Sequence, residues 1–303
     1  MAATAGHDSL IASIGNFDGV HFGHRTLLGL TVTRATELSL PSLAVTFQPY
    51  PIEILKKIDI KHLCGFEKKV ELLAATGLNL LYVLPFTREL AALDARSFIL
   101  KYLQPLGVKE MFVGFNFRMG NDCADSESLI AMDQEQGIHV HSIEAVLHHA
   151  LPISSTRIRT ALTDGDLPLA NAMLGRPYSV RGEIIHGHCR GGPLLGMPTA
   201  NIAPGNQLMP FSATYATETR FPNRPDNPDQ HWPSLTNFGR NPTFGENSLS
   251  LETHLLDFCG DIYGQVIEIN FLHILRQERK FSSPEELKEQ LNEDVVQRRE
   301  LLI

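Results

Sequence analysis

The chain has 303 residues, of which 43% are hydrophobic and 20% are charged, and these proportions are typical of a folded globular protein rather than a disordered one. The length allows two domains. The formal net charge of −8 argues against nucleic acid or an anionic membrane as the main partner, because both favour basic surfaces.

The N-terminal segment and the cysteines indicate where the protein works. Residues 1–17 contain neither a basic stretch nor a long apolar run, so they predict neither a signal peptide nor a membrane anchor. The four cysteines form no C-x-x-C pair, so we expect reduced thiols in a cytoplasm rather than a zinc site or a disulfide framework. The histidine pairs at 139/141 and 148/149 are more often solvated or hydrogen-bonded than metal-bound.

The first half of the chain alternates short apolar runs with segments of helical periodicity. The expected strands are Leu10–Ile14, Ser42–Phe47, Leu80–Leu84, Met111–Gly114 and His139–Val146. The expected helices are His21–Leu38, Phe66–Thr76 and Ala95–Leu103, the last with Asp94 as its N-cap. This alternation predicts a doubly wound, Rossmann-like parallel sheet, in which ligands bind at the carboxyl ends of the strands.

The second half of the chain is richer in glycine and proline and reads as short alternating strands. The expected strands are Tyr178–His186, Thr214–Arg220, Ser234–Phe238, Leu249–Leu256 and Val266–His273. They predict an antiparallel barrel or sandwich, with Phe221–Pro233 as a proline-rich surface loop and a final helix that begins at Ser283-Pro284. We therefore expect a domain of residues 1–174 and a second domain of residues 175–303.

A candidate phosphate site follows the first expected strand. Gly15 and Gly19 permit a tight turn and a close approach of backbone to a ligand. His21 and His24 are three residues apart, so at the start of a helix they share one face. There they can donate hydrogen bonds to phosphate oxygens beside the free N–H groups of the helix, which is the stabilisation that adenylyl transfer requires.

The segment that carries these histidines reads G-N-F-D-G-V-H-F-G-H, and it resembles the signature of the prokaryotic bifunctional riboflavin kinase/FAD synthetase family. The resemblance implies an N-terminal FMN adenylyltransferase with His21 and His24 as catalytic residues. It also implies that Gly15, Asn16 and Phe17 contact ATP.

Two further motifs of the first half resemble the same family. The run P-I-S-S-T-R-I-R implies that Ser155, Thr156 and Arg159 hold the phosphates of ATP, and hydroxyls and a guanidinium suit that purpose. The run G-F-N-F-R-M-G implies that Asn116 binds flavin or ATP.

The second half contains the run G-H-C-R-G-G-P-L-L-G-M-P-T-A-N, which resembles the riboflavin kinase signature. A glycine-rich flap over phosphates, followed by hydroxyl and amide oxygens, suits Mg²⁺ and ATP. The resemblance implies that Gly191 and Gly192 contact ATP and that Thr199 and Asn201 bind Mg-ATP. The runs L-E-T-H-L-L-D-F and L-R-Q-E-R-K-F also look like family motifs, and they imply Glu252 as the general base and Arg276 as a flavin contact.

Two departures from the family motifs leave alternatives open. Tyr50 stands where the family has histidine in T-F-x-P-H-P, and Asp125 adds a carboxylate after the G-F-N-F-R-M-G run. The leading interpretation is one enzyme that makes FMN and then FAD, both with Mg²⁺ and ATP. The alternatives are a riboflavin kinase with a weakened or inactive first domain, a non-catalytic flavin or nucleotide regulator, and a different H-x-G-H transferase. The oligomeric state is not predicted.

Overall fold

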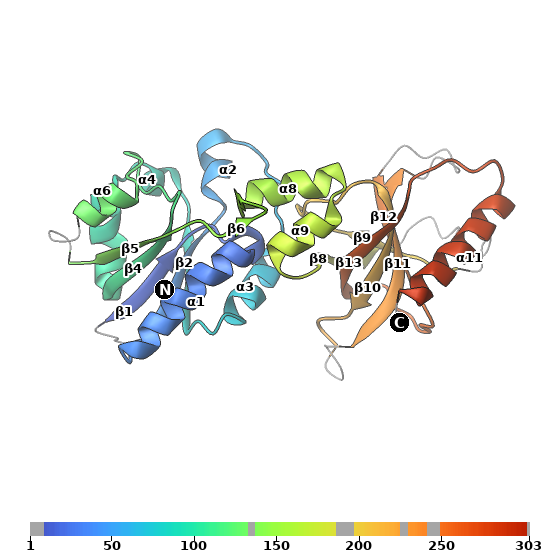
Figure 1. Cartoon of the computed structure of the whole chain (residues 1–303), viewed down its shortest axis with the longest axis horizontal. Coiled ribbons are helices and arrows are strands. Elements are labelled where there is room, and N and C mark those ends of the chain that lie inside the picture. Colours follow the sequence, from blue (N-terminus) through green and yellow to red (C-terminus); the bar gives the residue numbers. More distant parts are fainter. Residues whose placement is uncertain (1–8, 133–136, 186–196, 225–229, 241–248, 302–303) are drawn as a thin grey trace. The chain divides into compact units, whose positions relative to one another are not determined.

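The structure is a computed structural model that describes residues 9–132, 137–185, 197–224, 230–240 and 249–301 (Figure 1). The chain forms two compact units, one of Met1–Lys61 with Phe66–Ser155 and the other of His62–Gly65 with Thr156–Ile303. Each unit has its own sheet.

The first unit contains a five-stranded parallel sheet, which confirms the predicted doubly wound fold. Its strands are β1 (Leu10–Ile14), β2 (Ser42–Gln48), β3 (Leu80–Pro85), β4 (Val108–Gly114) and β5 (His139–Ile143). Their order is β3-β2-β1-β4-β5, and all four pairings are parallel. After β1 the chain adds β2 and β3 on one side of β1, and it then adds β4 and β5 on the other side. The carboxyl ends of β1 and β4 therefore form the switch point, which is where such sheets bind ligands.

Helices cover both faces of this sheet, because the strand side chains alternate between two apolar cores. Leu10, Ala12 and Ile14 belong to one core, together with side chains that follow the N-cap Asp94 in α5 (Ala95–Phe98) and in the π-helical turn Ile99–Leu103. Ile11 belongs to the other core, with side chains of α1 (Phe22–Glu37) and α3 (Phe66–Ala74). Shorter helices complete the unit: α2 (Pro51–Lys56), α4 (Arg88–Ala91) and α6 (Ser126–Ala131).

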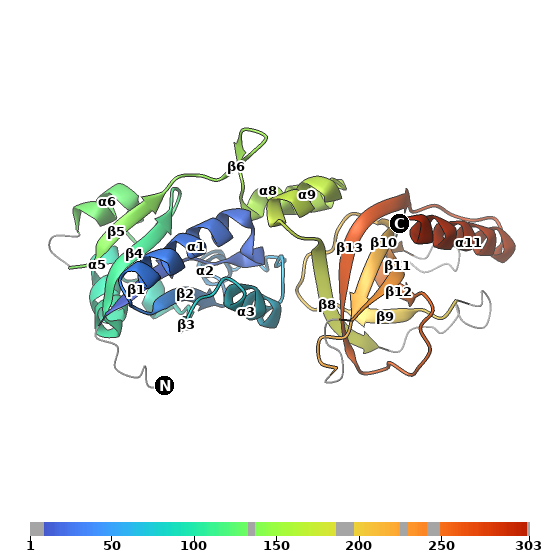
Figure 2. The ribbon, with the colours of Figure 1, turned by 60° about the horizontal axis from the view of Figure 1, so that its bottom comes forward.

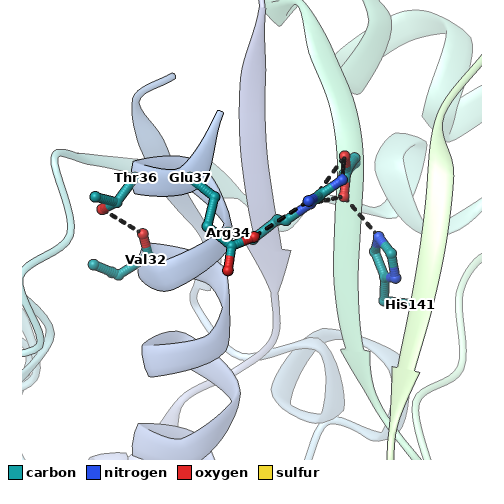
Figure 3. Close-up of polar contacts among 6 residues, drawn as sticks. Val32, Arg34, Thr36, Glu37 and His141 are labelled. Atoms are coloured by element: carbon teal, nitrogen blue, oxygen red, sulfur yellow. Dashed lines mark hydrogen bonds and ion pairs between the residues drawn. The ribbon is translucent and has the colours of Figure 1, made fainter. Parts of the chain in front are cut away.

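An ionic cluster attaches the last turn of α1 to the sheet. The guanidinium of Arg34 donates to both carboxylate oxygens of Glu110 on β4, with Nη2 2.9 Å from Oε1 and Nε 2.9 Å from Oε2 (Figure 3). Nε2 of His141 on β5 lies 2.7 Å from Oε2 of Glu110. The hydrogen bond from Arg34 lowers the pKa of Glu110, so the carboxylate stays ionised between its two partners.

The second unit contains a closed barrel, which confirms the barrel and rules out the sandwich. Its strands are β8 (Tyr178–Ile185), β9 (Ala200–Ala203), β10 (Ala213–Arg220), β11 (His231–Arg240), β12 (Leu249–Leu255) and β13 (Val266–Gln277), in the order β10-β11-β12-β9-β8-β13. All described pairings are antiparallel. Helices α8 (Ser155–Asp164) and α9 (Leu167–Leu174) precede the barrel, and a small hairpin, β6 (Leu147–His148) with β7 (Leu151–Pro152), precedes α8.

The prediction that Phe221–Pro233 is entirely loop is wrong at its end. β11 already begins at His231, and Pro233 pairs with Glu218 of β10. At that point β12 has ended, since its last pair joins Leu255 to Ser234. Pro233 therefore needs no ladder N–H on that side, and its carbonyl oxygen accepts a hydrogen bond from the backbone N of Leu256.

The predicted final helix is α11 (Pro284–Glu300), and it packs against β11 (Figure 2). Ser283 caps it by accepting a hydrogen bond from the backbone N of Glu286, and Pro284 occupies its first turn. Arg298 is fully buried and donates to the carbonyl oxygen of Thr217 through Nε and Nη2. The buried side chains of the helix are Asp294 and Arg298, so polar contacts hold it to the barrel.

Candidate active sites

The turn that joins β1 to α1 has an unusual backbone. Phe17, Gly19 and Val20 all have positive φ, at 49°, 72° and 38°, and Asp18–Val20 form a short 3-10 turn. Only glycine adopts this region readily, and a β-branched residue such as valine almost never does. Phe17 is fully buried, and its ring lies against Gly15, where an added Cβ would come within 3.2 Å of it. The surrounding structure must therefore hold this turn in its strained form.

The turn presents the two predicted catalytic histidines at the start of α1. His21 is the N-cap, and its Nδ1 accepts a hydrogen bond of 3.2 Å from the backbone N of His24. The neutral His21 ring therefore carries its hydrogen on Nε2. The two rings are stacked, with centroids 3.6 Å apart and an angle of 14° between their planes. The structure thus brings the pair together on one face, as the sequence predicts.

Burial keeps His24 neutral. It holds the pKa of His24 well below the usual value of 6.5, and the neighbouring His21 and Lys69 lower it further. Nδ1 of His24 is buried and makes no hydrogen bond within the described residues. A neutral imidazole can still donate one hydrogen bond to a phosphate oxygen, which suits a group that stabilises charge as it develops.

Buried polar contacts fix the turn from several directions. The hydroxyl of Tyr50 donates to Oδ1 of Asp18 over 3.2 Å, and both residues are buried. The hydroxyl of Ser155, predicted as an ATP contact, donates to the carbonyl oxygen of Asp18 over 3.1 Å. The hydroxyl of Thr46 on β2 donates to the carbonyl oxygen of Asn16 over 3.2 Å. Asn16 itself is exposed at the surface of the turn.

Lys69 on α3 belongs to this site and was not predicted. It is 1% exposed, and its Nζ lies 3.4 Å from the hydroxyl oxygen of Thr46 and 3.5 Å from the carbonyl oxygen of Asn16. The same atom lies 4.6 Å from the centroid of the Tyr50 ring. A lysine on an amphipathic helix usually faces solvent, so only its contacts in the folded chain identify it.

The remaining predicted residues of the first site follow β4 or stand at the start of α8. Asn116 is exposed just beyond the end of β4, which pairs with β1, so it follows the same edge of the sheet. Thr156 and Arg159 follow Ser155 in the first turns of α8, three residues apart and so on one face. Asp125, the added carboxylate, is the N-cap of α6, where Oδ1 accepts hydrogen bonds from the backbone N and the hydroxyl of Ser128.

A second cluster forms on adjacent strands of the barrel. Glu252 on β12 pairs directly with Asn201 on β9, and Oε2 of Glu252 accepts a hydrogen bond of 3.4 Å from the hydroxyl of Thr199. Oε1 accepts a hydrogen bond of 3.2 Å from the hydroxyl of Ser250. The structure therefore brings together Thr199, Asn201 and Glu252, although the short strand β9 was not predicted. Gly191 and Gly192 lie outside the described residues.

Two more polar residues extend this row across the barrel and were given no role by the sequence. Asn237 on β11 pairs with Glu252 on one side and with Thr214 of β10 on the other. The hydroxyl of Thr214 donates to Oδ1 of Asn237 over 3.3 Å. Directly opposed residues of antiparallel strands have their side chains on the same face, so Asn237 is a neighbour of the proposed base.

Arg276, predicted as a flavin contact, has a structural partner. It pairs with Thr214 in the β10–β13 register, and its Nε donates to both carboxylate oxygens of Asp294 on α11, at 3.1 and 3.0 Å. Nη2 of Arg276 lies 2.9 Å from Oδ2 of the same carboxylate. This bidentate pair attaches α11 to the barrel and fixes the guanidinium beside the row that contains Glu252.

The donor atoms around Glu252 are suited to magnesium. A hydroxyl, an amide oxygen and a carboxylate are hard oxygen ligands, and Mg²⁺ in proteins commonly takes one or two carboxylates together with substrate phosphates. Among the described residues, no group of three or more His, Cys, Asp or Glu side chains could hold a metal ion. His141, of the histidine pair at 139/141, is hydrogen-bonded to Glu110.

In the first unit, His21 caps α1 and His24 lies in its first turn, beside the switch point of a parallel sheet, and this geometry is that of a nucleotide-binding protein. Comparison with protein-family models extends this to both units. The model for FAD synthetase matches residues 4–157, and the model for riboflavin kinase matches residues 174–302. The chain belongs to the bifunctional riboflavin kinase/FMN adenylyltransferase family.

Individual relatives agree over almost the whole chain. The bifunctional riboflavin kinase/FMN adenylyltransferase of Pseudomonas fluorescens is 35% identical over 298 residues, which cover 97% of this chain and 94% of that protein. The protein of the same name from Escherichia coli K12 is 34% identical, covering 98% of this chain and 94% of its own length. The crystal structure of the "Macrolide-efflux Protein from Streptococcus pneumoniae" has a TM-score of 0.86 and 30% identity, covering 97% of this chain and 95% of that one.

No helix among the described residues is long and apolar enough to cross a membrane.

Proposed function

We propose that this chain catalyses two consecutive steps of flavin-nucleotide synthesis. Riboflavin and ATP give FMN and ADP, and FMN and a second ATP then give FAD and pyrophosphate. The observation that carries the proposal is that one chain contains both the neutral histidine pair of α1 and the Thr199–Asn201–Glu252 cluster of the barrel. We assign adenylyl transfer to residues 1–174 and riboflavin phosphorylation to residues 175–303.

In the adenylyl-transfer step, a phosphate oxygen of FMN attacks the α-phosphorus of ATP and pyrophosphate leaves. Negative charge builds on the α-phosphate oxygens, and His21 and His24 donate hydrogen bonds to them from neutral rings, supported by the positive end of the α1 dipole. The residues that would hold the rest of ATP are Gly15, Asn16, Phe17, Ser155, Thr156 and Arg159. Asn116 would contact the flavin.

In the kinase step, Glu252 accepts the proton of the ribityl 5′-hydroxyl as that oxygen attacks the γ-phosphorus of ATP and ADP leaves. Thr199 and Asn201 would hold Mg²⁺ with the ATP phosphates, and Mg²⁺ would neutralise charge on the phosphoryl group. Gly191 and Gly192 would cover the phosphates. Arg276 would contact the flavin from the position that Asp294 fixes.

We further propose that the partners of the protein are these small molecules rather than nucleic acid, and that it acts in the cytoplasm. The net charge of −8 supports the first point. The exposed thiols of Cys123 and Cys259 support the second, since they would persist best in a reducing compartment.

The proposal is tested by incubating the purified chain with riboflavin, ATP and Mg²⁺ and following the flavins by chromatography. FMN that appears first and is then converted to FAD supports two active units. FMN alone would show that the first unit is inactive, and the absence of both products would show a binding protein without catalysis.

A further inference from the structure

We propose that Tyr50 and Lys69 are positioning residues for adenylyl transfer, which together hold the strained turn Asn16–Val20 so that His21 and His24 face the α-phosphate of ATP. This inference deepens the proposed function and depends on it. Neither side chain needs to touch the substrate, because both act through the turn.

The turn requires such a support. Three of its residues, Phe17, Gly19 and Val20, adopt positive φ, and for Phe17 and Val20 this conformation carries a cost that the turn alone does not repay. The turn leads directly into His21, whose Nδ1 accepts a hydrogen bond from the backbone N of His24 and so caps α1. A relaxed turn would therefore displace the N-cap and with it both imidazole rings.

Tyr50 holds the middle of the turn. Its hydroxyl donates to Oδ1 of Asp18 over 3.2 Å, and the residues are 4% and 3% exposed, so water does not compete strongly for this hydrogen bond. Tyr50 is itself fixed, since its backbone N donates to Oε2 of Glu53 over 2.7 Å in the first turn of α2. The residue that departs from the family motif thus supplies an O–H donor to the catalytic turn.

Lys69 holds the beginning of the turn. Its Nζ lies within hydrogen-bonding distance of the Asn16 carbonyl oxygen, at 3.5 Å, and of the Thr46 hydroxyl oxygen, at 3.4 Å. The Tyr50 ring lies 4.6 Å and the Phe66 ring 5.5 Å from the same atom, so the ammonium is also stabilised by two aromatic faces. An ammonium group is costly to bury, and one of the contacts that offset this cost is the carbonyl oxygen of Asn16 in the turn.

The two residues form one support because they touch each other. The Tyr50 ring lies against the ammonium group while its hydroxyl reaches Asp18, so removal of either side chain loosens the other. Lys69 also acts electrostatically on the site, since its positive charge is one of the causes that lower the pKa of His24.

The test compares Tyr50→Phe, Lys69→Met and Lys69→Arg with the unmodified full chain. FAD formation from FMN and ATP is measured as kcat and KM, and FMN formation from riboflavin in the same preparation reports the barrel. We expect kcat for FAD formation to fall about tenfold in Tyr50→Phe, by the loss of one buried hydrogen bond, and further in Lys69→Met. We expect KM for ATP and FMN formation to change less than about threefold, and Lys69→Arg to recover most of the loss by keeping the charge.

A pH profile separates positioning from a general loss of folded protein. Burial lowers the pKa of His24 most, and the neighbouring His21 and Lys69 lower it further. Lys69→Met should therefore move the acid limb of kcat for FAD formation to higher pH, whereas Lys69→Arg should not. A smaller folded fraction would lower the rate at every pH without moving the limb. Tyr82→Phe on β3 and Lys101→Met, a lysine over the Tyr102 ring, are the matched controls and should keep the unmodified kcat.

The inference is overturned if Tyr50→Phe and Lys69→Met form FAD at the unmodified rate, or if both lose FMN formation in equal measure. If Lys69→Met fails to fold, Tyr50→Phe decides alone, because it keeps the ring and nearly the same volume. An unmodified chain that makes no FAD would contradict the proposed function instead, so the two failures are distinguishable.

Discussion

Replacement of the proposed base, Glu252→Gln, gives the sharpest test of the kinase site. Glutamine has the same shape, and its amide oxygen can still accept the hydrogen bond from Thr199 or from Ser250, which in the native chain span 3.4 and 3.2 Å. The pairing of position 252 with Asn201 is a backbone feature and remains. The substitution therefore removes basicity with little change in packing.

The size of the effect follows from the role. A general base contributes about 10²–10⁴ in rate, which is about 3–5 kcal/mol of transition-state stabilisation. We expect kcat for FMN formation to fall by that factor, with KM for riboflavin and ATP almost unchanged. Initial rates are measured by chromatography of the flavins, with FAD formation from supplied FMN as the internal control. Retention of kcat for FMN formation within about tenfold would remove Glu252 from the role of base.

The remaining predictions concern both units. His24→Ala should depress FAD formation by about 10²-fold and spare FMN formation, measured in the same preparation, and equal loss of both activities would contradict separate sites. Because the pKa of His24 is lowered, FAD formation should persist below pH 6.5, and a pH–rate profile with half its activity lost at 6.5 would contradict this. Because the pKa of His24 is lower in the folded chain than in the unfolded chain, the unfolded chain binds the proton more readily below pH 6.5. The melting temperature of the first unit should therefore fall as the pH is lowered, and it should fall less steeply in His24→Asn. Asp294→Ala should leave Arg276 without its partner, loosen α11 in hydrogen exchange and lower the melting temperature by several degrees.

The sequence predicts the first unit well because its central strands, β1, β2 and most of β4, are buried on both faces. β1 was predicted with its observed bounds, Leu10–Ile14, and the other four parallel strands differ by a few residues, since continuous apolar runs mark such strands. His139–Val146 was predicted too long, and the chain leaves β5 at Ile143. The helix predicted over Ala95–Leu103 changes to a π-helical turn after Phe98, a change that periodicity does not reveal.

The sequence predicts much less about how the sites are supported. Lys69 is 53 residues from Asn16 and 23 from Thr46, and its place on α3 gives it the pattern of an ordinary solvated lysine. β9 has only four residues and follows a glycine- and proline-rich run, so its alternation is too short to recognise. The neighbours of Glu252 across the barrel, Asn201 and Asn237, become evident only once the strand register is known.

The two departures that favoured a weakened first unit have structural partners. Asp125 caps α6, and the hydrogen bonds from Ser128 lower its pKa, so its charge has a local role at a helix N-terminus. Tyr50 stands where the family has histidine, and it makes a polar contact of its own. Its hydroxyl donates a hydrogen bond to the buried Asp18 within the catalytic turn. Since the turn is strained and depends on such contacts, a residue that provides one favours an active adenylyl-transfer site, and the bifunctional interpretation is preferred over a kinase with an inactive first domain.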